Sequence, residues 1–333
     1  MKLPNMIVAK KWKKRNKMIR LDEKLKGITT VGISGHVRPD GDCVGSTLAV
    51  YNYISTYYPE IKVELFLESI PDVFLFLKNA DKIQHEFEDD KAFDLFIVLD
   101  CGDEGRLGPF ARYYEAAKHT LCIDHHVSNQ AFAEDNFIIP DASSTCELVF
   151  RMFDTEKITK EIAECLYTGM VHDTGVFQYS CTSSETMNFA GVLMEKGIDY
   201  PKIVTDTFYL KTYDQNRILG YALLNSKLYL DGKVIVTYLT KENLAEFHCT
   251  TKDLDGIVNQ LRVTKGTDVA VFLYESEDGS FKASFRVTGD INVAEIAQTF
   301  GGGGHVKAAG CNIFGTIDEV IERILAEIEK RYY

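Results

Sequence analysis

Three apolar stretches that each run into acidic or histidine residues constrain this chain more than any other feature. Residues 28–34 lead into Gly35–Asp42, residues 95–99 lead into Asp100, and residues 121–123 lead into Asp124-His125-His126. Loop or helix signals follow each stretch, so we interpret the three as buried strands of one parallel sheet. The carboxyl ends of such strands meet at one edge, where open α/β sheets bind ligands. The predicted fold class is therefore α/β.

The polar residues at these strand ends are of the types that bind metal ions. His36, Asp40 and Asp42 lie within seven residues on a turn shaped by Pro39 and Gly41, and Asp173 follows a helical stretch over 158–170. Carboxylates and imidazoles crowded together repel or stay unsatisfied unless metal ions neutralise them. The sequence thus predicts a dinuclear metal site. The alternative for the first turn is that its aspartates only cap the next helix, expected over 43–58.

These motifs, in this order, resemble the DHH phosphoesterase superfamily. The resemblance is greatest to its bacterial stand-alone oligoribonucleases that also remove phosphate from 3′-phosphoadenosine 5′-phosphate (pAp). It runs from about Ile19 to the C-terminus. It also includes a signature of the DHH-associated substrate domain, Gly301-Gly302-Gly303-Gly304-His305 followed by Ala308-Ala309-Gly310, with an arginine-bearing strand over 281–287 before it.

The resemblance implies the ligand set of two divalent metal ions. One ion takes His36, Asp40 and Asp100, and the other takes Asp42, Asp100, His125 and Asp173, with Asp100 bridging. Oxygen-rich ligation with one histidine per metal suits manganese or similar hard ions. No cysteine is expected in a position that favours a thiolate zinc site.

The remaining residues of the third motif receive different roles. The resemblance assigns His126 to the phosphate or the leaving oxygen as a hydrogen-bond donor, and Asp100 and His126 are the expected catalytic residues. The alternative is that His126 only orients Asp124. We interpret Asp124 as a residue behind the ligands that holds a ligand imidazole by its other nitrogen.

A second set of residues is expected to bind the substrate. The glycine run frees the backbone to approach a phosphate, and we expect its N–H groups to precede a short helix. The alternative is a loose linker. Ser143 and Ser144 are expected to cap a helix that begins near Thr145. The expected substrate contacts are Arg106, Arg286, Gly302, Gly303, Gly304 and His305.

Alternating strand and helix signals suggest two domains. Residues 1–18 carry a basic run that we interpret as an extension, with a nucleic-acid arm as the alternative. Residues 19–196 form the metal-binding domain, with strands near 28–34, 62–68, 94–100 and 119–124. A helical linker covers 197–228. A smaller α/β domain covers 229–333, with strands over 234–239, 268–274 and 281–287.

Composition limits the partners. The net charge of −12 argues against a long nucleic acid bound across a broad surface, but allows a substrate of a few nucleotides. No apolar run is long enough to span a membrane, and the eight scattered cysteines suggest free thiols in a cytoplasmic protein. The sequence leaves the oligomeric state open, with a homodimer as one candidate.

The predicted function is a metal-dependent phosphoesterase that degrades oligoribonucleotides of two to five nucleotides and dephosphorylates pAp. The alternatives are a soluble phosphodiesterase for cyclic di-AMP or its linear product pApA, an inorganic pyrophosphatase, and a nucleotide-sensing module without catalysis. Filled ligand positions disfavour the last of these.

Overall fold

The computed structural model of the chain describes residues 20–87 and 91–332. They form two compact units that divide between Leu210 and Lys211, inside the segment expected to be a linker. The basic run of the N-terminus lies outside the described residues. In the described part of the chain, no helix combines the length and the apolar character that a membrane span requires.

The first unit is built on a six-stranded, fully parallel sheet. Its strands are β1 (Thr30–Ser34), β2 (Lys62–Phe66), β3 (Ile83–Gln84), β4 (Leu95–Leu99), β5 (His119–Asp124) and β6 (Asp135–Ile138). Their spatial order is β3-β2-β1-β4-β5-β6, a doubly wound order that reverses direction between β1 and β4. The predicted α/β class is confirmed.

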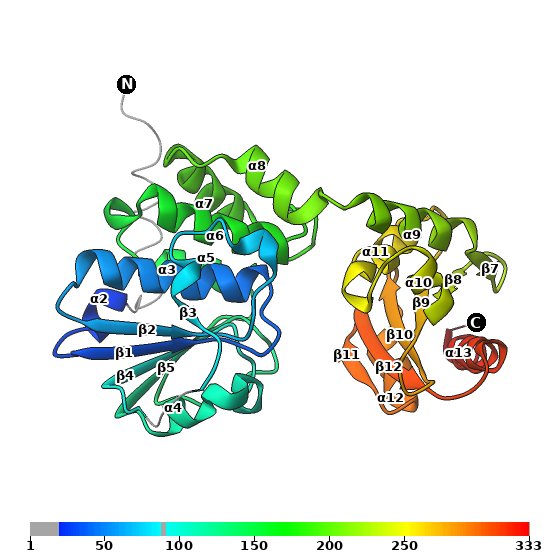
Figure 1. Ribbon diagram of the computed structural model, residues 1–333, viewed down its shortest axis with the longest axis horizontal. Helices are drawn as coiled ribbons and strands as arrows, with labels where there is room; N and C mark the ends of the chain where they lie inside the picture. Colours follow the sequence, from blue (N-terminus) through cyan, green and yellow to red (C-terminus); the bar gives the residue numbers. More distant parts are fainter. Residues whose placement is uncertain (1–19, 88–90, 333) are drawn as a thin grey trace. The chain divides into compact units, whose positions relative to one another are not determined.

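Helices cover both faces of this sheet (Figure 1). The α-helices are α2 (Leu21–Lys24), α3 (Gly41–Tyr57), α4 (Ala111–Glu115), α5 (Thr145–Met152), α6 (Lys160–Asp173), α7 (Ser184–Glu195) and α8 (Tyr200–Val204). Single-turn and irregular helices are η1 (Asp72–Phe74), η2 (Ala80–Lys82), η3 (Glu104–Phe110), η4 (Thr155–Lys157) and η5 (Thr205–Tyr209). Helices α3, α5, α6 and α7 lie along one face, and α4 lies on the other.

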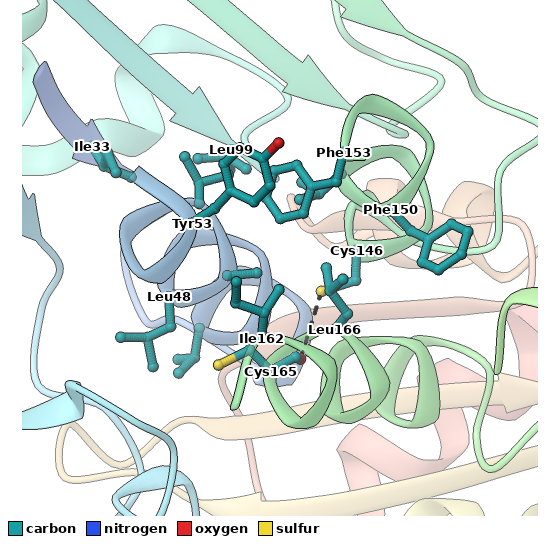
Figure 2. Close-up of a cluster of buried hydrophobic side chains, with 14 of the residues drawn as sticks. Ile33, Leu48, Tyr53, Leu99, Cys146, Phe150, Phe153, Ile162, Cys165 and Leu166 are labelled. Carbon is teal, nitrogen blue, oxygen red and sulfur yellow. Dashed lines mark hydrogen bonds between the residues drawn. The ribbon is translucent and has the colours of Figure 1, made fainter. Parts of the chain in front are cut away.

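Strand β4 shows why these strands read as continuous apolar runs. Leu95, Ile97 and Leu99 are buried under the large helical layer, and Phe96 and Val98 are buried in an aromatic cluster on the opposite face. A strand buried on both faces has no polar side to alternate with. Figure 2 shows part of the helical-face core, where Tyr53 of α3 stacks on Phe153 with ring centroids 4.0 Å apart.

The second unit contains a six-stranded mixed sheet in the order β11-β12-β10-β9-β8-β7. Its strands are β7 (Lys227–Tyr229), β8 (Val234–Leu239), β9 (Val269–Glu275), β10 (Phe281–Val287), β11 (Gly303–His305) and β12 (Ala308–Ile313). Its helices are α9 (Tyr213–Leu224), α10 (Lys241–Glu246), η6 (Thr251–Leu254), α11 (Ile257–Arg262), α12 (Val293–Thr299) and α13 (Ile317–Tyr332). Helices α12 and α13 pack with one face, and α9, α10 and α11 pack with the other.

Candidate metal centre

The acidic and histidine residues of all four motifs lie at one edge of the first sheet. His36 follows β1, Asp100 follows β4, and Asp124 ends β5, directly before His125 and His126. Asp42 lies in the first turn of α3, and Asp173 is the last residue of α6. This edge is where the strand order reverses, the position at which open α/β sheets bind ligands.

Asp100 stands between two groups of candidate ligands. Its Oδ2 lies 3.4 Å from His36 Nε2, and its Oδ1 lies 3.6 Å from His125 Nε2. Its backbone has a left-handed φ of +54°, an uncommon conformation for a residue other than glycine that often marks functional sites. One carboxylate that offers an oxygen to each side has the geometry of a bridging ligand.

The first group contains His36, Asp40 and Asp100. His36 is buried, and its Nδ1 lies 2.9 Å from the carbonyl of Val37, which leaves Nε2 facing the carboxylates. Its Nε2 lies 3.7 Å from Asp40 Oδ1. Asp40 also accepts hydrogen bonds from the backbone N–H groups of Asp42 and Cys43, so it caps α3 while facing the imidazole. The capping alternative therefore describes a real contact, but it does not compete with ligation.

The second group contains Asp42, His125 and Asp173. His125 Nε2 lies 3.0 Å from Asp173 Oδ2 and 4.0 Å from Asp42 Oδ2. One ligand atom from each of these three residues lies within 4.8 Å of the others, close enough to share a cation. The predicted ligands of both groups are thus brought together.

The electrostatics of the cluster favour a cation. Burial alone would lower the pKa of His36 and of His125, but the facing carboxylates raise the first to about 10 and the second to about 11. Burial and the neighbouring carboxylate Asp100 raise the pKa of Asp42, and burial raises the pKa of Asp173 to about 6. The raised pKa values show that the crowded carboxylates need positive charge nearby, which protons supply in the metal-free protein. Divalent ions can supply the same charge, so the cluster suits metal binding.

The start of α5 positions two of these ligands, which sequence reasoning missed. The backbone N–H of Thr145 donates to Asp42 Oδ2 at 2.6 Å, and that of Cys146 donates to Asp42 Oδ1 at 2.9 Å. The hydroxyl of Thr145 donates to Asp100 Oδ1 at 3.1 Å. Ser144 caps this helix as expected. The cap was readable from the sequence, but a contact across about a hundred residues was not.

Asp124 holds a different imidazole from the expected one. Its Oδ1 lies 2.7 Å from Nδ1 of His126, and Asn129 donates to its Oδ2 at 2.7 Å. The expected ligand His125 instead turns Nδ1 toward the carbonyl of Ala142, at 3.4 Å. Asp124 therefore orients His126, which also lies within reach of Asp100 and His125 as a candidate ligand, and not the predicted ligand His125. The hydrogen bond to Asp124 raises the pKa of His126.

One cysteine lies closer to the cluster than the sequence suggested. The sulfur of Cys43 lies within 4.8 Å of ligand atoms of His36 and Asp100. It is fully buried and its pKa is raised well above the usual value, mainly by burial. The sequence prediction is that no cysteine favours a thiolate zinc site, and burial, which keeps the Cys43 thiol neutral, is in line with that prediction. All eight cysteines are free thiols.

The expected substrate residues are spread over both units. Arg106 lies in η3, where its backbone carbonyl accepts the N–H of Val37 at 2.7 Å and so ties η3 to the loop after β1. Arg286 lies on β10 and is partly buried.

The glycine run does not precede a helix. Gly303, Gly304 and His305 instead form β11, which pairs with β12, so that prediction is wrong. An added Cβ at Gly304 would lie 2.5 Å from the backbone of Ala309, and its φ is +143°. Both features require glycine.

Fold and ligand cluster together define an α/β protein with a candidate metal centre at a sheet edge, and comparison with known proteins gives its family. Residues 30–170 match the model of the DHH family N-terminal domain, and residues 231–332 match that of the DHHA1 domain. The chain therefore combines a DHH family N-terminal domain with a DHHA1 domain.

Individual relatives agree with this assignment. A protein of Thermus thermophilus named bifunctional oligoribonuclease and PAP phosphatase NrnA is 28% identical over 94% of this chain and 94% of its own length. Its namesake in Bacillus subtilis is 29% identical over 90% and 94%. The crystal structure of an exopolyphosphatase-related protein from Bacteroides fragilis superimposes with a TM-score of 0.86 at 29% identity, over 93% of this chain and 94% of that one. The names of the two sequence relatives denote hydrolytic enzymes.

Proposed function

We propose that this protein is a two-metal phosphoesterase that degrades oligoribonucleotides of two to five nucleotides to mononucleotides and dephosphorylates pAp. The observation that carries the proposal is the shared carboxylate of Asp100, which offers one oxygen to each of two ligand groups. The names of the relatives support the choice of substrates.

In this proposal His36, Asp40 and Asp100 hold one ion, and Asp42, Asp100, His125 and Asp173 hold the other. Carboxylate and imidazole donors suit manganese. Two such ions, when bound, supply an activated water and neutralise the phosphoryl oxygens.

The protein residues contribute positioning and hydrogen bonds. Nδ1 of His126 forms a hydrogen bond with Asp124, so Nε2 is the ring nitrogen that can contact the substrate. In its protonated form, His126 donates a hydrogen bond from Nε2 to the phosphate or the leaving oxygen. Arg106, Arg286, His305 and the backbone of Gly302, Gly303 and Gly304 are the proposed phosphate contacts.

A substrate panel tests the proposal. The full chain is stripped of metal and reconstituted with manganese, and initial rates are measured on pAp, a dinucleotide, a tetranucleotide, pApA, cyclic di-AMP and pyrophosphate. We expect turnover of pAp and the short oligonucleotides, and none without metal. Rapid hydrolysis of pyrophosphate alone would contradict the proposal, as would full activity in metal-free buffer. Turnover confined to cyclic di-AMP and pApA would contradict the proposed substrates but support the two-metal phosphoesterase chemistry.

A further inference from the structure

One face of the second sheet is covered only in part. On β9, Ala270 and Phe272 are buried in the cluster beneath α9, α10 and α11. On the neighbouring strand β10, the residues of the same face are more exposed: Lys282 is exposed, and Ser284 and Arg286 are partly exposed. On the next strand, β12, Asn312 is also exposed on this face.

Strand register shows which residues share this open face. Lys282 pairs with Asn312, Ser284 with Gly310, and Arg286 with Ala308. Because directly paired residues point to the same side of a sheet, β12 adds two small residues and an amide beside the cations of β10. His305 of β11 pairs with Ala308 and so borders the same strip.

The charge of this strip differs from that of the whole chain. The charged side chains on this side of β10, β12 and β11 are Lys282 and Arg286, with His305 beside them, and none of the described residues of this strip is a carboxylate. The chain as a whole carries a net charge of −12. A cationic strip with a floor of glycine and alanine fits an anionic ligand that lies close to the backbone.

A hollow of about 650 Å³ lies at the Lys282 end of the strip. Its lining includes Tyr274, Lys282, Asn312, Thr250 and Lys241. Lys282 Nζ lies 5.8 Å from the centre of the Tyr274 ring. Two glutamates also line the hollow, and both contact Lys241: Glu275 accepts its backbone N–H at 3.2 Å, and Glu277 lies 4.0 Å from its Nζ. The charges of the two lysines and the two glutamates in the lining therefore cancel. An uncharged aromatic group suits the hollow better than a second phosphate does.

We propose that the strip and the hollow form a distal subsite for oligonucleotides of three or more nucleotides. Lys282 pairs with a phosphate beyond the one held at Arg286 and His305, and the hollow holds the attached base against Tyr274, with the amide of Asn312 at its edge. Lys282 and Arg286 are four residues apart on one strand, so their Cα atoms lie about 13 Å apart, which leaves room for two separate phosphates along the strip. The inference rests on the proposed function, and it adds that the second unit distinguishes longer substrates from pAp and dinucleotides.

Substitution of Lys282 tests the subsite. In the manganese-loaded full chain, Lys282→Ala should lower kcat/KM for a tetranucleotide about tenfold, chiefly through KM, and leave the values for a dinucleotide and pAp unchanged. Lys265→Ala removes an exposed lysine of the same unit outside the strip and serves as the matched control. Tyr274→Ala should reproduce the selective loss, and Tyr274→Phe should retain wild-type rates because the ring remains. Equal losses on all three substrates, or none on the tetranucleotide, would overturn the subsite.

A cross-link separates this inference from the proposed function. A tetranucleotide with 4-thiouridine as its distal base is irradiated with the wild-type protein, and the linked peptide is identified by mass spectrometry. We expect the peptide that contains Tyr274, and a cross-link confined to other peptides would refute the subsite. Wild-type protein that cleaves no oligonucleotide would overturn the proposed function instead, and the cross-link would still decide where the base binds.

Discussion

Thr145 contacts candidate ligands of both metal groups through hydrogen bonds. It is fully buried, its N–H reaches Asp42 and its hydroxyl reaches Asp100, so one residue orients a ligand of the second group and the shared carboxylate. Hydrogen bonds of this kind hold ligating carboxylates in the orientation that the metal needs.

Replacement of Thr145 tests this positioning role. Thr145→Val keeps the shape and the backbone N–H but removes the hydroxyl, so we expect manganese affinity to fall about tenfold, whereas Thr145→Ser should stay near wild type. Free Mn²⁺ measured by electron paramagnetic resonance during titration gives the affinity without a turnover assay. Wild-type affinity in the valine variant would show that the hydroxyl does not position Asp100.

At the scale of elements, a left-handed turn follows the last residue of α6. Gly175, Val176 and Phe177 have φ values of +55°, +58° and +62°. Such a run is costly for residues with side chains, and for β-branched valine above all. Thr174 holds it: its buried hydroxyl donates to the carbonyl of Met170 at 2.5 Å and accepts the N–H of Phe177 at 2.9 Å. The turn therefore fixes the chain direction directly after Asp173.

Loss of this hydroxyl should destabilise the first unit. Thr174→Val leaves a partly buried N–H and a carbonyl without the hydroxyl, so we expect the free energy of unfolding to drop by about 1–3 kcal/mol. Thr174→Ser keeps both hydrogen bonds and should cost clearly less. Urea unfolding of the metal-free proteins measures the difference, and equal stability of the two variants would contradict the role of the hydroxyl.

Glu64, on the strand next to the outermost strand β3, makes the stability of the first sheet depend on pH. It lies on β2, and its carboxylate lies 2.8 Å from Nζ of Lys62 and of Lys91 and accepts from Gln84 of β3 at 3.1 Å. Burial alone would raise its pKa, but these partners lower it to about 2. A lowered pKa in the folded state stabilises the fold above the ordinary pKa of a glutamate, and this contribution disappears as the pH falls toward 2.

We therefore expect Glu64→Gln to lower the free energy of unfolding by about 1–2 kcal/mol at pH 7. Between about pH 5 and pH 2, the variant should lose less stability than the wild type does. Glu60→Gln, an exposed position two residues before the strand, is the matched control. Unfolding curves across this pH range measure both effects. Parallel curves for wild type and Glu64→Gln would show that Glu64 does not contribute.

The elements also show what the sequence could predict and why the rest escaped. Strands β1, β4 and β5 are apolar on both faces, so their residues alone identify them. Strand β3 has two residues, β6 is only partly buried, and β11 is Gly303-Gly304-His305, so pairing with a neighbour defines them rather than side-chain pattern. The ligands could be proposed because each motif is local. The contact of Asp124 with His126 instead of His125 depends on side-chain direction, which spacing does not determine.

At the scale of the whole chain, charge sets the expected substrate length. The net charge of −12 offers a long polyanion few favourable contacts beyond the cationic strip of the second unit. We expect a 20-mer to be degraded about tenfold more slowly than a tetranucleotide with the same ends, and added salt to narrow the gap because it screens the repulsion. Initial rates at two salt concentrations measure this. Equal rates on the two lengths at low salt would refute the preference for short substrates.

The central claim is that one protein chain holds two metal ions that share Asp100. The most direct measurement is the number of manganese ions bound per chain, determined by calorimetric titration of the metal-free wild type and of Asp100→Asn. The account predicts two ions in the wild type, fewer in Asp100→Asn, and no turnover by that variant although its circular dichroism is unchanged. A wild type that binds a single ion, or an Asp100→Asn variant that binds two ions and turns over within tenfold of wild type, would contradict it.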